Sequence, residues 1–252
     1  MKKRILLRIT RKWHRYLGFF LGIQFLMWTL GGLYFSWTNI DNIRGDNLKN
    51  STPKIPSNLS FVTPNVFLKN HISNNDSILS LELSTILKQP IYRVEYEHKD
   101  QKNVLLFDAI TGEIRNPLSK EEAILVAQKK LNVTASIINK EYITTVGNHH
   151  EYRGRPLPAY AITFDAPANT TVYVSTEYGN VQTFRNNQWR IFDFFWMLHT
   201  MDYQERDNFN NILLRAFSLF GLFTIFSGFL LYGLTSKTLN KRRKKRSTVL
   251  NK

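Results

Sequence analysis

Cysteine is absent from the 252 residues of the chain. Disulfide bonds, thiol catalysis and cysteine-based metal sites are therefore excluded, and any folded part must be stabilised by its core alone. The sequence also lacks a glycine-rich phosphate loop, the Ser-His-Asp order of many hydrolases and a metalloprotease helix. These absences favour a non-catalytic protein.

Acidic residues are absent from both ends of the chain. Residues 1–15 carry seven Lys or Arg and residues 236–252 carry eight, which together account for the formal net charge of +15. Because these basic segments adjoin apolar runs, and are not interleaved with stacking aromatics on a folded face, the pattern argues against nucleic acid binding. We expect both tails to bind anionic lipid, at about 1 kcal/mol per nearby Lys or Arg.

Charge of either sign is absent from two long segments, 16–40 and 216–236. As a helix, each could cross about 30 Å of hydrocarbon. Basic residues flank the first segment on its N-terminal side and the second on its C-terminal side, so the positive-inside rule places both termini in the cytoplasm. The first segment is too long for a secretory signal and no small-residue cleavage site follows it, which favours a retained anchor.

The segment between the two apolar runs shows strand and helix signals. Polar, proline-containing residues 41–64 predict a linker. Alternating apolar residues predict strands over 91–96 and 104–107. Ser119 and Glu122 form the capping box of an amphipathic helix predicted over 119–131.

An internal repeat is visible in this segment. Its first copy comprises Pro90–Tyr92, residues 104–107 and the turn Thr111-Gly112, and its second comprises Pro158–Tyr160, residues 172–175 and the turn Tyr178-Gly179. A helix before each hairpin would cover its apolar face, and we expect these helices over 77–87 and 119–131.

The predicted fold class is therefore an α+β extracytoplasmic domain of two helix-plus-antiparallel-hairpin repeats, flanked by two transmembrane α-helices. In chain order, the predicted parts are a basic cytoplasmic tail (1–15), transmembrane helix 1 (16–40), a linker (41–64), the first repeat (65–117), the second repeat (118–185), a juxtamembrane amphipathic segment (186–209), transmembrane helix 2 (210–236) and a second basic cytoplasmic tail (237–252).

Several short motifs are spread over most of the chain. They are Ser119-x-x-Glu122-Ala123-x-x-x-Ala127, Pro158-x-Tyr160-x-Ile162, Val172-Tyr173-Val174, Tyr178-Gly179-Asn180-Val181, His14-x-x-x-Gly18-x-x-x-Gly22, Gly31-Gly32, Trp196-x-Leu198-His199 and Ser227-Gly228. Together they resemble the PepSY-associated transmembrane group of the PepSY proteins. The resemblance implies a bacterial inner-membrane protein with a periplasmic PepSY domain. Many members have four spans, whereas this sequence predicts two.

The resemblance implies two alternative functions. In the first, the periplasmic domain binds a polypeptide partner through strand edges or an exposed sheet face and restrains a neighbouring enzyme. The second is electron transfer in iron uptake, because some members of the group are haem-binding reductases linked to ferric siderophores. In that case His14 and His199 would supply axial ligands to haem b.

The predicted topology separates these two histidines by about a membrane thickness, so one haem cannot bridge them within a monomer. A homodimer through transmembrane helix 1 could pair each histidine with its counterpart. The alternatives are that His14 belongs to a basic interfacial cluster and His199 to a surface helix, while Gly18 and Gly22 serve helix packing alone. The sequence His149-His150-Glu151 favours a solvent loop over a metal site, and no metal ligand is predicted.

Overall fold

The computed structural model describes residues 2–236 of the chain. The basic tail predicted over 237–252 lies outside the described residues. The chain divides into two compact units. One is formed by the chain up to Trp37 and from Asp193 onward, and the other, named the central domain below, comprises Thr38–Phe192.

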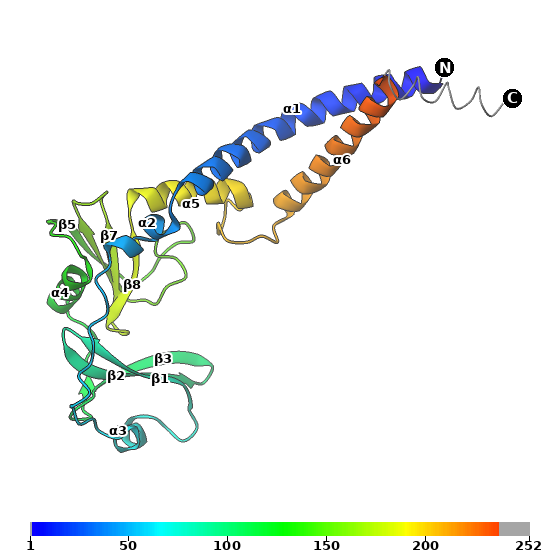
Figure 1. Ribbon diagram of the computed structural model, residues 1–252. Coiled ribbons are helices and arrows are strands. Elements are labelled where there is room, and N and C mark those ends of the chain that lie inside the picture. Colours follow the sequence, from blue (N-terminus) through cyan, green and yellow to red (C-terminus); the bar gives the residue numbers. More distant parts are fainter. Residues whose placement is uncertain (1, 237–252) are drawn as a thin grey trace. The chain divides into compact units, whose positions relative to one another are not determined.

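Two long helices dominate the first unit, α1 (Lys2–Trp37) and α6 (Ile212–Thr235). Both are long and apolar enough to cross a membrane, and they lie where the uncharged segments predict helices. They pack against each other as an antiparallel pair, seen side by side in Figure 1. Near one end His14 contacts Ser227, and further along a Cβ added to Gly221 would lie 3.5 Å from Phe25. The N-terminal end of α1 and the C-terminal end of α6 therefore lie on the same side.

Most of the surface of α1 is apolar and exposed, including Phe19, Phe20 and Ile23. Leu21 and Gln24 are buried on a narrow stripe with helical spacing. The buried Gln24 amide donates to the carbonyl of Leu198, at 2.8 Å, near the end of α5 (Asn187–Thr200). This distribution is expected for a helix that faces lipid over most of its circumference.

The first half of the central domain is a four-stranded antiparallel sheet. Its strands follow in sequence order: β1 (Ser77–Ile86), β2 (Gln89–His98), β3 (Gln101–Asp108) and β4 (Ile114–Arg115). Helix α3 (Pro64–His71) packs on this sheet through Phe67, whose ring lies 4.5 Å from that of Phe107 and 5.3 Å from that of Tyr92. The predicted strands over 91–96 and 104–107 are confirmed.

The helix expected over 77–87 is wrong, because these residues form β1. Leu81 and Leu83 alternate with polar residues at the period of a strand, and pairing with β2 in register (Leu83 opposite Tyr92) fixes that period. The helix of this half is α3, which begins with Thr63 as its N-cap and Pro64 as its first residue.

The second half is another four-stranded antiparallel sheet with the same strand order. It comprises β5 (Ile137–Ile143), β6 (Ala159–Phe164), β7 (Thr171–Ser175) and β8 (Asn180–Arg185). Helix α4 (Lys120–Lys130) precedes it and begins with the predicted capping box of Ser119 and Glu122. Buried Ala123 and Ala127 belong to the core cluster between α4 and the sheet. That the two halves are copies of one PepSY-like repeat stays a prediction.

The predicted linker over 41–64 is folded in its first part. Helix α2 (Ile40–Arg44) and the 3-10 turn η1 (Asp46–Leu48) bury Ile43 and Leu48. Between them Gly45 has a φ of +68°, and a Cβ there would lie only 2.9 Å from the Cβ of Phe184. The folded domain therefore begins near Ile40, inside the predicted linker, since these residues contribute to the core and dock on β8.

The two sheets share one core. The largest buried cluster contains Ile86 and Leu106 of the first sheet together with Ile162, Phe164 and Val174 of the second. A polar contact accompanies it, because the buried Arg93 side chain donates to the carbonyl of Tyr178 at 2.9 Å. The two sheets of the central domain therefore pack on one shared core, and we expect them to unfold together.

Candidate functional site

His14 lies in the interface of the helix pair. Its Nδ1 is 2.7 Å from the hydroxyl oxygen of Ser227. A Cβ added to Gly228 would lie 3.3 Å from the His14 ring, so this glycine allows the close approach. The sequence pair Ser227-Gly228 is thus placed directly against His14.

The hydrogen bonds around Ser227 favour one tautomer for a neutral His14 ring. The Ser227 hydroxyl donates its one hydrogen to the carbonyl of Thr224, at 2.8 Å. Its oxygen then serves as the acceptor for a proton on His14 Nδ1. In that tautomer Nε2 keeps a lone pair, which is the state required of a metal or haem ligand.

His199 lies at the end of α5 among aromatic side chains. Its ring centroid is 6.1 Å from that of Trp28, 6.2 Å from that of Phe35 and 6.4 Å from that of Trp196. The Trp196 ring is nearly parallel to it, with an interplanar angle of 18°. The exposed imidazole of His199 is therefore held by ring contacts with α1 and with its own helix.

The structure does not bring the two histidines together. His14 and Trp28, the α1 residue beside His199, are fourteen positions apart on one helix, a rise of about 21 Å. Gly18 and Gly22 lie off the interface with α6, because a Cβ at either position would meet no atom of α6 within 4 Å. The predicted homodimer through α1 and the predicted haem ligands therefore stay predictions.

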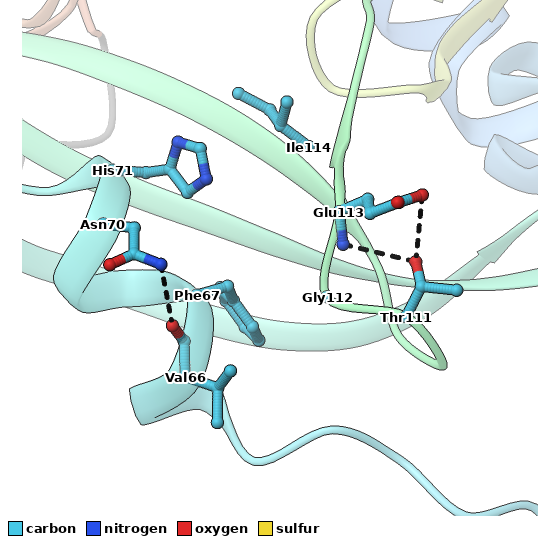
Figure 2. A pocket seen from close by; sticks show the side chains of 8 residues that line it. All are labelled: Val66, Phe67, Asn70, His71, Thr111, Gly112, Glu113 and Ile114. Atoms are coloured by element: carbon cyan, nitrogen blue, oxygen red, sulfur yellow. Dashed lines mark hydrogen bonds between the residues drawn. The ribbon is translucent and has the colours of Figure 1, made fainter.

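A shallow groove of about 580 Å³ lies between α3 and the turn that joins β3 to β4, shown in Figure 2. Its lining includes exposed apolar Val66 and Ile114 on opposite sides and the His71 ring. The Thr111 hydroxyl oxygen accepts from the backbone N–H of Glu113 at 3.3 Å, so this polar group serves the turn itself. The groove offers an apolar contact surface beside the short edge strand β4.

The opposite edge of the same sheet is β1, which is long and open. Ile78, Leu79 and Leu81 are 47, 46 and 39% exposed. Within β1 the one charged residue is Glu82, which forms an ion pair with Arg93 of β2 at 2.8 Å. Edge strands of soluble domains are commonly protected by Lys or Pro, and β1 contains neither.

The second sheet does not have the exposed face that the sequence suggests for partner binding. All five residues of β7 are buried. Helix α4 covers one face of the sheet, and residues 144–158 cover the other, where Tyr152 stacks on Tyr173 with ring centroids 4.7 Å apart. Binding of a polypeptide partner through this sheet is therefore restricted to its edges.

The family model that describes the PepSY-associated TM region matches residues 2–234. The chain belongs to this family. Membership of the PepSY-associated TM family confirms the resemblance predicted from the motifs, and with the two candidate spanning helices it identifies a membrane protein that carries a PepSY domain. No curated protein matches the chain, and no solved structure does.

The open edge of this PepSY-associated TM protein escaped sequence reasoning because its strand was taken for a helix. The alternation of Leu81, Glu82 and Leu83 was the signal that could have found it. The ion pair between Glu151 and Arg190 carried no such signal, since these residues are far apart in the chain. His14 and His199 were found by their position beside the apolar runs.

Proposed function

We propose that this protein is a non-catalytic, membrane-anchored module whose central domain binds an extended polypeptide segment along β1. The observation that carries the proposal is the open, apolar edge formed by Ile78, Leu79 and Leu81. An added strand would pair with the free backbone groups of β1, and its side chains would contact these apolar residues. Restraint of a neighbouring enzyme is the regulatory role that such binding would serve.

The proposed location is the bacterial inner membrane, with the central domain in the periplasm. Two observations support it. The antiparallel helix pair has the N-terminal end of α1 and the C-terminal end of α6 on one side. The segment before the first span carries seven basic residues and no acid. The positive-inside rule assigns that side to the cytoplasm. A reporter fused at Asn148 that faces the cytosol would contradict this topology.

Site-specific photo-crosslinking in cells tests the binding edge. A photoreactive amino acid replaces Leu79 on β1, and a matched probe replaces Ile110, which has nearly the same exposure (46 and 48%) but lies in the turn after β3. We expect a discrete polypeptide adduct from position 79 that is absent from position 110. Leu81→Lys in the same chain should remove the adduct, because it places a charge on the edge. Equal adducts at both positions, or an adduct that survives Leu81→Lys, would refute the proposal.

A second candidate function is electron transfer through haem b, in support of ferric siderophore reduction. The specific observation that favours it is the hydrogen bond between His14 Nδ1 and Ser227, an arrangement that leaves Nε2 of the neutral ring available as a ligand. His14 and His199 would each hold a separate haem, completed by the same residue of a partner chain in a homodimer. Haem iron with axial imidazoles supplies one-electron transfer.

Absorbance of the purified protein from haem-replete cells tests this second function. A Soret band is expected, and His14→Ala and His199→Ala should each reduce it. His98→Ala is the matched control, because His98 is an exposed histidine of β2 in the central domain. A protein without a Soret band, or a band that both ligand variants leave intact, would remove the haem candidate.

A further inference from the structure

A cluster of arginines lies on the face of the second sheet that residues 144–158 cover. Arg153 and Arg155 belong to that loop, Arg185 to β8, and Arg190 to α5. Glu151, also in the loop, forms an ion pair with Arg190 of this cluster.

Both carboxylate oxygens of Glu151 accept hydrogen bonds, and these come from two partner residues. Its Oε1 accepts from the Tyr173 hydroxyl at 2.7 Å and from Arg190 Nη2 at 3.0 Å, and its Oε2 accepts from Arg190 Nε at 2.8 Å. The other N–H groups of Arg190 donate to the carbonyl of Asn169, Asn187 Oδ1 and Thr171 Oγ1. Each of the five Arg190 donors has an acceptor, and its charge is paired.

Arg185 differs from Arg190 although it lies in the same cluster. Its Nε donates to the backbone carbonyl of Glu151 at 2.8 Å, and its Nη1 donates to Thr183 Oγ1 at 2.6 Å and to the Phe184 carbonyl at 3.1 Å. Among the described residues Nη2 has no acceptor, and no carboxylate pairs with this guanidinium. The Trp189 ring lies 4.0 Å from the guanidinium carbon and covers it on one side.

Arg155 adds a second cation beside Arg185. Its side chain is exposed. Burial, followed by the like charge of Arg155, lowers the pKa of Arg185 to about 10, against the weaker attraction of Glu151. An anion bound beside these two arginines would offset both the repulsion and the desolvation.

We propose that Arg155 and the Nη2 edge of Arg185, beside Trp189, bind a phosphate group. A planar guanidinium presents paired N–H donors that match phosphate oxygens, and the second cation adds charge at short range. The Trp189 ring gives the site one apolar wall. The same chemistry is offered by a phospholipid headgroup and by a soluble phosphate compound. This site is on the second sheet and is independent of the β1 edge.

Calorimetric titration of the full chain in a phosphate-free maltoside detergent tests the site. The two probes are inorganic phosphate and dihexanoyl phosphatidylglycerol below its micelle concentration. Binding of inorganic phosphate identifies a soluble ligand class, whereas binding of the lipid alone identifies a headgroup site. Binding of neither probe would overturn the proposal.

Two variants and a control locate the binding. Arg155→Gln removes an exposed charge and should weaken binding about tenfold, the loss expected for one charge-assisted hydrogen bond. Lys102→Gln removes an equal charge from β3 of the first sheet and should leave affinity unchanged. Arg185→Lys keeps the charge, removes the Nη2 edge and should also weaken binding. Wild-type affinity in Arg155→Gln or in Arg185→Lys would refute the site.

Discussion

The two sheets of the central domain have the same strand order, and one helix precedes each of them, yet they are covered differently. Strands β1 and β2 are joined by the two residues Leu87 and Lys88, both with positive φ. Strands β5 and β6 are joined by residues 144–158, which fold over the sheet. The first sheet keeps an apolar edge strand without Lys or Pro, whereas both faces of the second are covered and its edge strand β5 contains Lys140.

This difference shows how one connection changes the use of a sheet. A tight turn leaves the backbone groups of β1 available to another chain, because nothing from the connection covers them. The long connection instead supplies Tyr152, which packs on Tyr173, and Glu151, which pairs with Arg190. The proposed polypeptide binding therefore concerns the first sheet, and the proposed anion binding concerns the second.

The largest expected effect tests whether the two sheets are one unit. Phe164→Ala removes a ring that is 1% exposed in the shared core, and it should lower the free energy of unfolding by about 3–5 kcal/mol. Hydrogen exchange should accelerate in both sheets, because they share that core. Unchanged exchange in β2 and β3 would show instead that the two sheets unfold independently, as two separate domains.

A smaller effect is expected where the long connection is held to the second sheet. Glu151→Gln removes the charge that Arg190 contacts at 2.8 Å, and we expect a loss of about 1–3 kcal/mol in denaturant unfolding. Glu141→Gln, at an exposed position of β5, is the control and should change stability by less than about 0.5 kcal/mol. Equal effects of the two changes would mean that the ion pair does not hold the connection.

The turns that follow β3 and β7 allow a third test. Asp108 and Ser175 occupy equivalent places, each with a backbone carbonyl that accepts from a glycine four residues later, Gly112 or Gly179. Partial desolvation opposes ionisation of Asp108, but hydrogen bonds from Thr111, from Gln89 and from the backbone of Ile110 outweigh it, so its pKa is lowered. Asp108→Ser should therefore cost about 1 kcal/mol at neutral pH.

The pH dependence of that difference follows from the lowered pKa. A carboxyl group whose pKa is lower in the folded state contributes stability above its unfolded pKa of about 3.9, and this contribution is lost as the pH falls through the folded value. Denaturant unfolding of the wild type and of Asp108→Ser should therefore converge in acid. A difference that persists at the lowest pH would mean that the carboxylate charge is not its cause.

The smallest change in stability is expected at the open edge itself. Leu81→Lys should alter the free energy of unfolding by less than about 0.5 kcal/mol, because the residue is 39% exposed and lies outside the buried clusters. Thermal unfolding followed by circular dichroism measures this. A loss above about 2 kcal/mol would show that Leu81 supports the core, and the loss of crosslinking could then not be attributed to binding.

Sequence patterns predicted the elements whose signals are local. The capping box of Ser119 and Glu122 predicted α4, and alternation with flanking turns predicted β2, β3, β6 and β7. The helix predicted over residues 77–87 was wrong. Leu, Glu and Ser are compatible with a helix by composition, but pairing with β2 makes these residues a strand. The start of α3 at Thr63-Pro64 was a readable signal that the linker interpretation concealed.

Long-range contacts explain what sequence patterns could not predict. The Glu151–Arg190 pair and the docking of Gly45 against Phe184 join residues from distant segments, and no spacing rule relates them. His14 was identified as a candidate from its place beside an apolar run. Its tautomer, however, depends on Ser227 and Thr224 of another helix.

The helix pair has a thermodynamic consequence for the cysteine-free domain between its two members. Because α1 and α6 pack on each other, both ends of the intervening chain stay attached to one helix pair even when that chain is unfolded. A restraint of this kind removes entropy from the denatured ensemble, as a covalent crosslink does. Association of the two spans thus acts as a non-covalent crosslink, which a thiol reductant cannot break.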